Sequence, residues 1–244
     1  MATREAYLLA GATASGKSAA AAILAREMGA SILSADSMLV YRGMDVGTAK
    51  PSVEERVEFS MGGVDVVTPA DHFSSGAWLR AAANWLNDLP ASRPIVIVGG
   101  TGLYFSALLR GLDREWTSPP PEYPVLQVER AVLHDRIARR LDTMFMDGLA
   151  AEVESLRREY PVWSDTASAA IGYKEFIDGM APAAVREKIL VRTRQLAKRQ
   201  DTWFRHQATP LYAPIGETAE ETAANVKRIW SEHGPWTVCL EKGA

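Results

Sequence analysis

Short apolar runs alternate with longer stretches of mixed polarity along the first hundred residues of the chain. Three mostly apolar runs are typical of buried strands, at 6–10, 30–35 and 95–98. The Ala-rich stretch 18–28 predicts a helix, and apolar residues at helical spacing predict another at 75–89. Strands that alternate with helices in this way indicate an α/β fold with a parallel sheet.

The remainder of the chain is predicted to be largely helical. Helices are expected at 103–112, at 133–158 with a break at Gly148, from 170 onward, at 186–205 and at 219–232. Short strands are expected at 64–67, 125–128, 211–215 and 236–240. The Gly- and Pro-containing segment 38–51 predicts irregular structure. Segment 113–124 is rich in proline, which predicts a linker without regular structure.

The first predicted strand runs directly into the sequence GATASGKS at 11–18. It fits the phosphate-loop pattern G-x-x-x-x-G-K-[ST] at every required position, between a strand and a helix. Backbone N–H groups of such a loop and the helix N-terminus face phosphate oxygens. Lys17 would reach the outer oxygens, and the Ser18 hydroxyl would hold Mg²⁺. We therefore predict a P-loop NTPase-like parallel sheet flanked by helices, with a helical C-terminal part, in one domain over 1–244.

Two further polar side chains follow predicted strands, Asp36 and Thr101. Ligands bind at the carboxyl ends of strands in open α/β sheets, so Asp36 would lie near the phosphate loop if the first two strands are neighbours. The alternative is that Asp36 is only a turn or cap residue. The strand at 95–98 ends in Gly99-Gly100, where many phosphate-loop NTPases carry a Mg²⁺-binding aspartate. This difference argues against a motor ATPase or a GTPase.

The charge of the chain is unevenly distributed. The 244 residues have a formal net charge of −3, whereas 186–205 has seven cations and two anions, a local charge of +5 that favours an anionic partner. A second set of cations on one predicted helix forms either a solvated face or a lid over phosphates: Arg136, Arg139 and Arg140. The first apolar run is too short for a signal peptide, and no apolar run approaches 18 residues, so we expect a soluble cytoplasmic protein without a membrane span.

Six blocks of the chain resemble the tRNA dimethylallyltransferases, also called isopentenyltransferases, and they occur in the order of that family. The most specific are DSM-VYRGMD-GTAKP and AIGYKE. The blocks are GATASGKS at 11–18, ADSMLVYRGMDVGTAKP at 35–51, GGTGLYFSALLRGL at 99–112, RIARRLDTMFMDGLAAEV at 136–153, AIGYKE at 170–175 and TRQLAKRQDTWFR at 193–205.

The resemblance implies transfer of a dimethylallyl group from its diphosphate to the exocyclic amine of an adenine, in tRNA the one just after the anticodon. That amine is a poor nucleophile and needs a general base, which the resemblance assigns to Asp36. The implied catalytic residues are Asp36, Lys17, Thr101 and Arg194. The diphosphate would be held by Gly11, Thr13, Ala14, Ser15, Gly16, Lys17, Ser18 and Arg194, with Mg²⁺ on Ser18. The acceptor would be bound by Asp36, Ser37, Met38, Leu39, Thr101, Lys198 and Arg199.

The chain departs from the family pattern after Gly111. Family members usually carry a helical insertion domain there, which helps to grip the anticodon stem-loop, and here the predicted linker 113–124 takes its place. The acceptor is therefore either tRNA, bound with a smaller footprint, or a smaller adenine compound such as AMP. Two other classes stay open, a small-molecule kinase and a non-catalytic RNA-binding protein. We expect a monomer whose partners are dimethylallyl diphosphate and the tRNA anticodon stem-loop.

Overall fold

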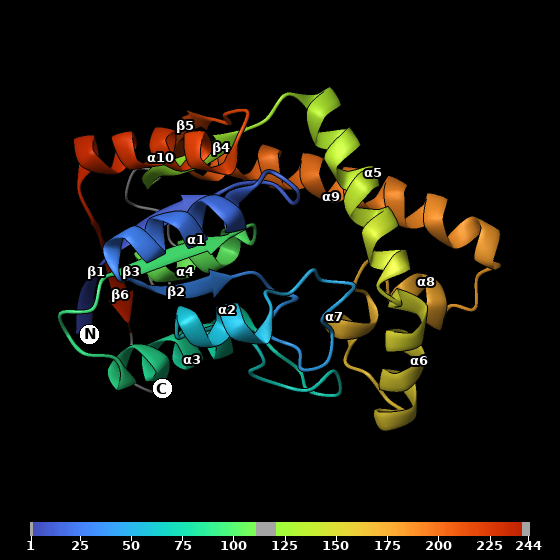
Figure 1. The fold of residues 1–244 in the computed structure, drawn as a ribbon. Helices are drawn as coiled ribbons and strands as arrows, with labels where there is room; N and C mark the ends of the chain where they lie inside the picture. Colours follow the sequence, from blue (N-terminus) through green and yellow to red (C-terminus); the bar gives the residue numbers. More distant parts are fainter. Residues whose placement is uncertain (1, 111–120, 241–244) are drawn as a thin grey trace.

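The computed structural model describes residues 2–110 and 121–240 of the chain (Figure 1). In this part, six strands form one sheet in the order β2-β3-β1-β4-β5, all parallel, with β6 antiparallel to β1. The strands are β1 (Ala2–Ala10), β2 (Ser31–Ala35), β3 (Ile95–Gly99), β4 (Glu122–Gln127), β5 (Thr209–Pro214) and β6 (Trp236–Leu240).

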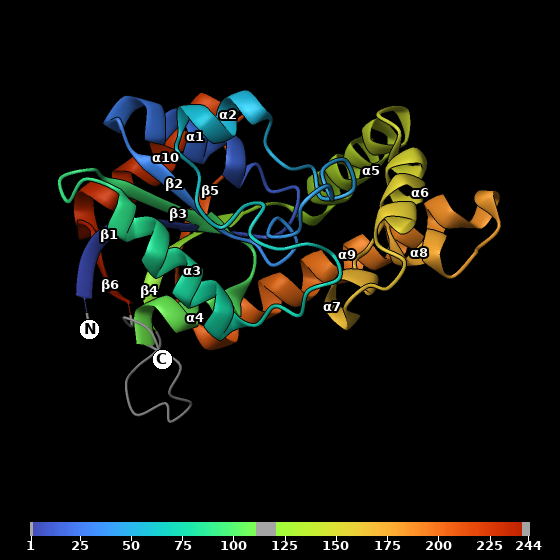
Figure 2. The ribbon, with the colours of Figure 1, turned by 90° about the horizontal axis from the view of Figure 1, so that it is seen from below.

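Two helical layers cover the sheet, as Figure 2 shows from below. Leu9, Val96 and Val98 pack against α1 (Lys17–Met28) and α10 (Ala219–His233). Leu8, Leu33 and Ile97 belong to the core beneath the opposite layer. That layer consists of α3 (Ser75–Asp88), α4 (Gly102–Arg110) and the C-terminal half of α9 (Pro182–Gln207). Successive residues of a strand point to opposite faces, which is why a continuous apolar run serves both layers.

A helical lobe extends beyond the carboxyl ends of the parallel strands (Figures 1 and 2). It contains the N-terminal half of α9 and four further helices: α5 (Arg130–Met146), α6 (Leu149–Glu159), α7 (Asp165–Ser168) and α8 (Lys174–Ile177). Gly148 separates α5 from α6 with a φ of 91°, so the predicted break is confirmed. The lobe places long helices beside the loops that follow the strands.

Several predictions about the elements need correction. The first two strands, β1 and β2, are not neighbours, because β3 lies between them. All three are parallel, however, so their carboxyl ends still share one edge. Residues 64–67 form no regular strand, and Val67 only bridges to Tyr41. The structure also contains a helix that the sequence analysis did not predict, α2 (Val53–Glu58), which begins with a capping box between Ser52 and Glu55.

The predicted linker ends earlier than expected, because 122–124 belong to β4. Pro124 is tolerated in this strand because β1 pairs with β4 only at Val125, which leaves β5 as the paired neighbour at Pro124. The stretch 113–120, and the end of the helix predicted at 103–112, lie outside the described residues.

Candidate active site

The loop between β1 and α1 has the conformation that its sequence predicts. Ala14 and Gly16 both have a left-handed backbone, with φ of 61° and 96°. Such a conformation costs little at Gly16, whereas at an alanine it is strained and persists only where the surroundings enforce it. The Lys17 side chain folds back over the loop, and its Nζ donates a hydrogen bond to the Ala12 carbonyl oxygen (3.1 Å).

Helices from the C-terminal half of the chain brace this loop. Gln200 on α9 accepts a hydrogen bond from the Thr13 backbone N–H (2.8 Å) and donates one to the Gly100 carbonyl oxygen (3.1 Å). Arg136 on α5 donates to the Ser15 carbonyl oxygen (3.1 Å). The Ser15 hydroxyl is buried without a hydrogen-bond partner among the described residues. The phosphate loop is therefore a junction between the sheet, α5 and α9.

The three arginines of α5 take two different roles. Arg136 and Arg140 are four residues apart and so share one helix face, which contacts the phosphate loop. Arg140 donates to the Thr13 hydroxyl (3.4 Å) and to the Thr48 carbonyl oxygen (2.8 Å). Arg139 instead pairs with Asp135 in solvent, with 72% of its side chain exposed. Arg139 thus belongs to a solvated face, whereas Arg136 and Arg140 contact the phosphate loop.

Asp36 and Thr101 meet at the carboxyl edge of the sheet, after the adjacent strands β2 and β3. One carboxylate oxygen of Asp36 accepts a hydrogen bond from the Met38 backbone N–H (2.9 Å). The Thr101 hydroxyl accepts one from the Ser37 backbone N–H (3.0 Å). Asp36 therefore stabilises a turn, as the alternative interpretation expected, and it also lines the cavities beside that turn.

Two cavities adjoin each other at this edge. The larger, of about 450 Å³, extends between the phosphate loop and α9, and Ser37, Met38 and Thr101 line it. The smaller, of about 290 Å³, lies over the first turn of α1, where Lys17 and Ser18 line it. Four residues line both cavities: Thr13, Asp36, Thr48 and Arg140. Two ligands that enter from different sides could therefore meet beside Asp36.

The remaining predicted site residues lie at different places around this centre. Leu39 lines the smaller cavity, and Arg199 lines the larger one. Lys198 lies in a groove on the outer side of α9, which Arg199 also lines. Arg194 is not among the described residues that line either cavity, but its Nε is buried without a hydrogen-bond partner in the described part of the chain.

Sequence reasoning missed Gln200 and Thr48, although both contribute to the site. Gln200 lies on the same face of α9 as Thr193 and Leu196, which also line the larger cavity. That helical spacing was visible in the sequence, but the position of the helix relative to the loop was not. Thr48 belongs to an irregular segment, whose path no periodicity specifies.

Burial changes the acidity of the phosphate-loop lysine. The pKa of Lys17 is lowered to about 8 by three effects together: removal from water lowers it most, the Asp36 carboxylate raises it, and the Arg140 guanidinium lowers it. A lysine with such a pKa gains or loses its charge near neutral pH, so its attraction for an anion depends on pH.

The donor set suits a magnesium ion that is bound mainly by its substrate. In residues 2–110 and 121–240, no group of three or more His, Cys, Asp or Glu side chains could hold a metal on its own. Mg²⁺ usually keeps several waters and takes one or two protein oxygens together with phosphate oxygens. The exposed Ser18 hydroxyl and the Asp36 carboxylate line the smaller cavity together and would fit this pattern.

The fold and the site together define a phosphate-loop protein with a carboxylate between two adjoining cavities. Family models specify it further: "IPP transferase" matches residues 39–124 and 118–207, and "Isopentenyl transferase" matches residues 4–59. The tRNA dimethylallyltransferase of Trichormus variabilis is 31% identical over 266 residues, which cover 81% of this chain and 90% of that relative. That of Azoarcus sp. is 33% identical over 281 residues, covering 82% and 87%. The chain belongs to the IPP transferase family.

Solved structures agree on the fold. A tRNA isopentenylpyrophosphate transferase from Bacillus halodurans superposes with a TM-score of 0.78 at 25% identity, covering 94% of this chain and 96% of its own. One from Staphylococcus epidermidis superposes with a TM-score of 0.79 at 23% identity, covering 93% and 99%.

The sequence matches also indicate residues that relatives have and this chain lacks. The two pieces of the IPP transferase match meet at 118–124, inside the segment expected to be a linker. The alignment to the Trichormus variabilis relative runs over 266 residues, more than the 244 residues of this chain. Part of that relative is therefore aligned with no residue of this chain.

Proposed function

We propose that this chain transfers a dimethylallyl group from dimethylallyl diphosphate to the N6 amine of an adenine in tRNA. The observation that carries the proposal is the wall shared by the two cavities, formed by Thr13, Asp36, Thr48 and Arg140. A reaction at carbon needs the acceptor amine beside the donor carbon, with a base within reach of the amine proton. Asp36 lines both spaces, so a base at this position is within reach of an acceptor amine placed beside the donor.

The smaller cavity is the proposed donor site. Lys17 and Ser18 line one part of it, and Ile32, Phe59 and Met61 give another part an apolar wall. A diphosphate with a short hydrocarbon chain needs both kinds of surface. The apolar wall also excludes water from the allylic carbon, which gains positive charge in the transition state.

In the proposed step, the C–N bond forms as the bond between the allylic carbon and the diphosphate oxygen breaks. The N6 proton passes to the Asp36 carboxylate, and the electron pair of the C–O bond leaves with the diphosphate. Lys17 and the loop N–H groups stabilise the charge of the leaving group. Mg²⁺ bound to Ser18 and the phosphates would neutralise part of that charge.

Two arginines support the leaving group in different ways. Arg140 contacts the loop through Thr13 and is therefore already placed beside the donor cavity. Arg194 lies outside the described lining of the proposed donor cavity, and its buried Nε has no hydrogen-bond partner among the described residues. We retain Arg194 in the proposed diphosphate site on the family resemblance alone, and Thr101 beside Asp36.

The larger cavity is the proposed adenine site, with Ser37, Met38 and Thr101 on its wall. Arg199 connects it with the outer groove of α9, where Lys198 and Trp203 also lie and no carboxylate occurs among the described lining residues. RNA flanking the adenine would find cations and an aromatic ring there. This continuity favours tRNA over AMP, because AMP would leave the groove unused.

The proposal extends to the organisation and setting of the protein. We propose a single core domain without the helical insertion, supported by the split family match at 118–124 and by the alignment gap. A cytoplasmic monomer would suit a tRNA substrate. None of the helices in the described residues is both long and apolar enough for a membrane span.

An acceptor assay tests the proposal. The protein is incubated with radiolabelled dimethylallyl diphosphate, Mg²⁺ and either unmodified tRNA or AMP, side by side. Transfer to tRNA is expected. Transfer to AMP alone would assign the smaller acceptor, binding of tRNA without turnover would indicate a non-catalytic RNA-binding protein, and ATP-dependent phosphorylation without prenyl transfer would support the kinase alternative.

A further inference from the structure

The backbone segment 44–48 forms part of the wall between the two cavities, although it has no regular secondary structure. Gly47 and Thr48 line the larger cavity, and Thr48 also lines the smaller one. An irregular segment does not fix its own path through a hydrogen-bond ladder. Its position must therefore come from other parts of the molecule.

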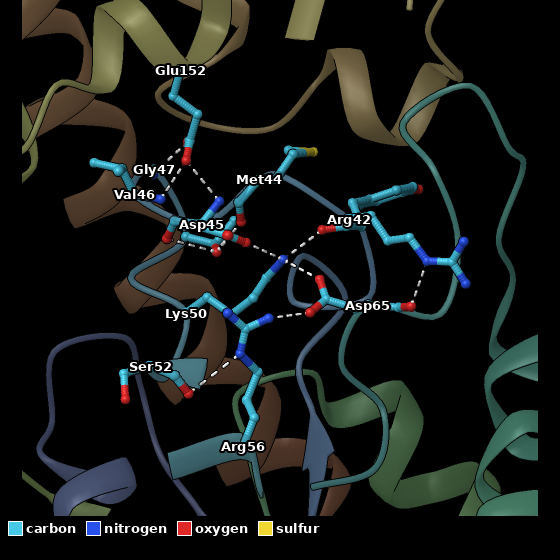
Figure 3. A network of polar contacts seen from close by, with 12 residues as sticks. Arg42, Met44, Asp45, Val46, Gly47, Lys50, Ser52, Arg56, Asp65 and Glu152 are labelled. Atoms are coloured by element: carbon cyan, nitrogen blue, oxygen red, sulfur yellow. Dashed lines mark hydrogen bonds and ion pairs between the residues drawn. The ribbon is translucent and has the colours of Figure 1, made fainter. Parts of the chain in front are cut away.

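A single carboxylate from the helical lobe holds this segment (Figure 3). Glu152, in the first turn of α6, accepts hydrogen bonds from three consecutive backbone N–H groups. The distances are 2.9 Å from Asp45, 2.7 Å from Val46 and 3.1 Å from Gly47. Each bond to a charged acceptor is stronger than one between neutral groups, so the three together favour one backbone path strongly.

Tyr173 contacts both Glu152 and the segment. Its hydroxyl donates a fourth hydrogen bond to the Glu152 carboxylate (2.6 Å). The buried Tyr173 ring also packs against Gly47, where an added Cβ would come within 2.5 Å of a ring carbon. Only a glycine fits beneath the ring, so Tyr173 and Glu152 together define how close the segment approaches the lobe.

The far end of the segment is anchored to the sheet side of the molecule by Lys50, whose side chain is fully buried. Its ammonium group pairs with Asp45 (2.6 Å) and Asp65 (2.7 Å) and donates to the Tyr41 carbonyl oxygen (2.6 Å). Arg56 pairs with the other Asp65 oxygen. Figure 3 shows Lys50 near its centre, between Asp45 and Asp65, with Arg56 below. The segment is thus fixed at both ends, with Thr48 between them.

Thr48 transmits this position to the reaction centre. Its carbonyl oxygen accepts a hydrogen bond from Arg140 (2.8 Å), and the same guanidinium donates to the Thr13 hydroxyl of the phosphate loop (3.4 Å). A shift of the segment would therefore move the wall of the larger cavity at Gly47 and Thr48, and the wall of the smaller cavity at Thr48 alone.

We propose that Glu152 is a positioning residue for the acceptor: with Tyr173, it sets the 44–48 segment and thereby the wall of the cavity that receives the adenine. The acceptor part rests on the proposed function. The role requires a carboxylate, because four donors converge on two oxygens. A glutamine has one acceptor oxygen, and its NH₂ group would face donors that it cannot satisfy.

The test replaces Glu152 with glutamine and measures two properties of the intact protein. The first is hydrogen exchange of the 44–48 amides, which reports the hold on the segment without reference to activity. The second is steady-state transfer, with KM determined separately for tRNA and for dimethylallyl diphosphate. Glu154→Gln is the matched control, since Glu154 lies on the same helix, is 74% exposed and pairs only loosely with Arg158 (3.4 Å).

The expected result for Glu152→Gln is faster exchange at 44–48, with exchange in the β1 and β3 strands unchanged. The KM for tRNA should rise about tenfold or more, which is the loss that one or two charge-assisted hydrogen bonds produce. The KM for the donor should rise less than the KM for tRNA, because Thr48 is the one residue of 44–48 that lines the smaller cavity. Tyr173→Phe, which removes one of the four donors and keeps the ring, should change both properties in the same direction but less.

Unchanged exchange at 44–48 in both variants would overturn the proposal. Faster exchange with equal increases in both KM values, or with a lower kcat alone, would overturn the acceptor role. If Glu152→Gln does not fold, the Tyr173→Phe variant decides by the same two criteria. A wild-type protein that transfers nothing would refute the proposed function, and the exchange measurement would still decide whether Glu152 holds the segment.

Discussion

Lys17 shows how one buried side chain determines the pH range of the site. Burial lowers its pKa to about 8, so the free protein carries the charge at pH 7 and has largely lost it at pH 9. A diphosphate binds the cationic form. The loss of charge with rising pH therefore weakens donor binding, and the effect appears above the lowered pKa rather than below it.

The first prediction follows from this pKa. The affinity of the free protein for dimethylallyl diphosphate should fall about tenfold between pH 7 and pH 9, because the protonated fraction of Lys17 falls by that factor. Isothermal titration calorimetry across this range measures it. Lys17→Met should bind weakly at every pH and show no step, whereas a wild-type affinity that stays constant through pH 9 would contradict the assignment.

At the residue scale, the sequence indicates which residues carry the chemistry better than it indicates where those residues lie. Asp36 and the loop residues lie where their motifs indicated, because residues after parallel strands meet at one edge whichever strand lies between. Arg194 was assigned by resemblance alone and lies outside the described lining of both cavities. Glu152 could not be found at all, since its partners are backbone amides that are 105 to 107 residues away.

At the scale of elements, α9 connects the two halves of the site. One of its residues, Gln200, contacts both the phosphate loop after β1 and the glycine turn after β3. The second prediction concerns this bridge. Gln200→Ala leaves the Thr13 N–H without its partner, which should lower the free energy of unfolding by about 1–3 kcal/mol.

Urea unfolding followed by circular dichroism measures this change, and donor binding should weaken in the same variant. Glu187→Gln, an exposed position on the same helix, serves as the control and should leave both quantities at their wild-type values. Equal stability of Gln200→Ala and wild type would show that the bridge is dispensable.

The elements themselves were predictable to different degrees. Long periodic or apolar stretches such as β3 and α3 follow directly from the pattern of side chains, and Trp78 on α3 is fully buried. Helix α2 was not predicted because it has only six residues and buries none of them, so its sequence has no periodic pattern of apolar residues. Strand β4 begins at Glu122 despite Pro124, because the pairing context that tolerates proline is not visible in the sequence.

At the scale of the whole molecule, positive charge is concentrated on α9. The net charge of −3 hides the +5 of 186–205, which α9 carries on the layer next to the larger cavity. Composition could reveal the cluster but not its place beside the site. That place is what makes RNA the favoured partner.

The third prediction tests this surface. Lys198→Ala should weaken tRNA binding at low salt and reduce the slope of log K against log salt concentration by about 0.7–0.9, the share of one phosphate contact. Fluorescence anisotropy with labelled tRNA measures the slope. Lys227→Ala, on α10 across the sheet and paired with Glu27 at 2.7 Å, should leave the slope unchanged. Identical slopes for all three proteins would exclude the groove as an RNA surface.

The central claim is that Asp36 acts as the base where the two cavities meet. Single-turnover transfer from labelled dimethylallyl diphosphate to tRNA, compared between wild type and Asp36→Asn, tests it most directly. The account predicts that wild type transfers the label to adenine N6, whereas Asp36→Asn still binds the donor but reacts about 10²–10⁴-fold more slowly. No transfer by wild type, or an Asn variant that reacts at the full rate, would contradict it.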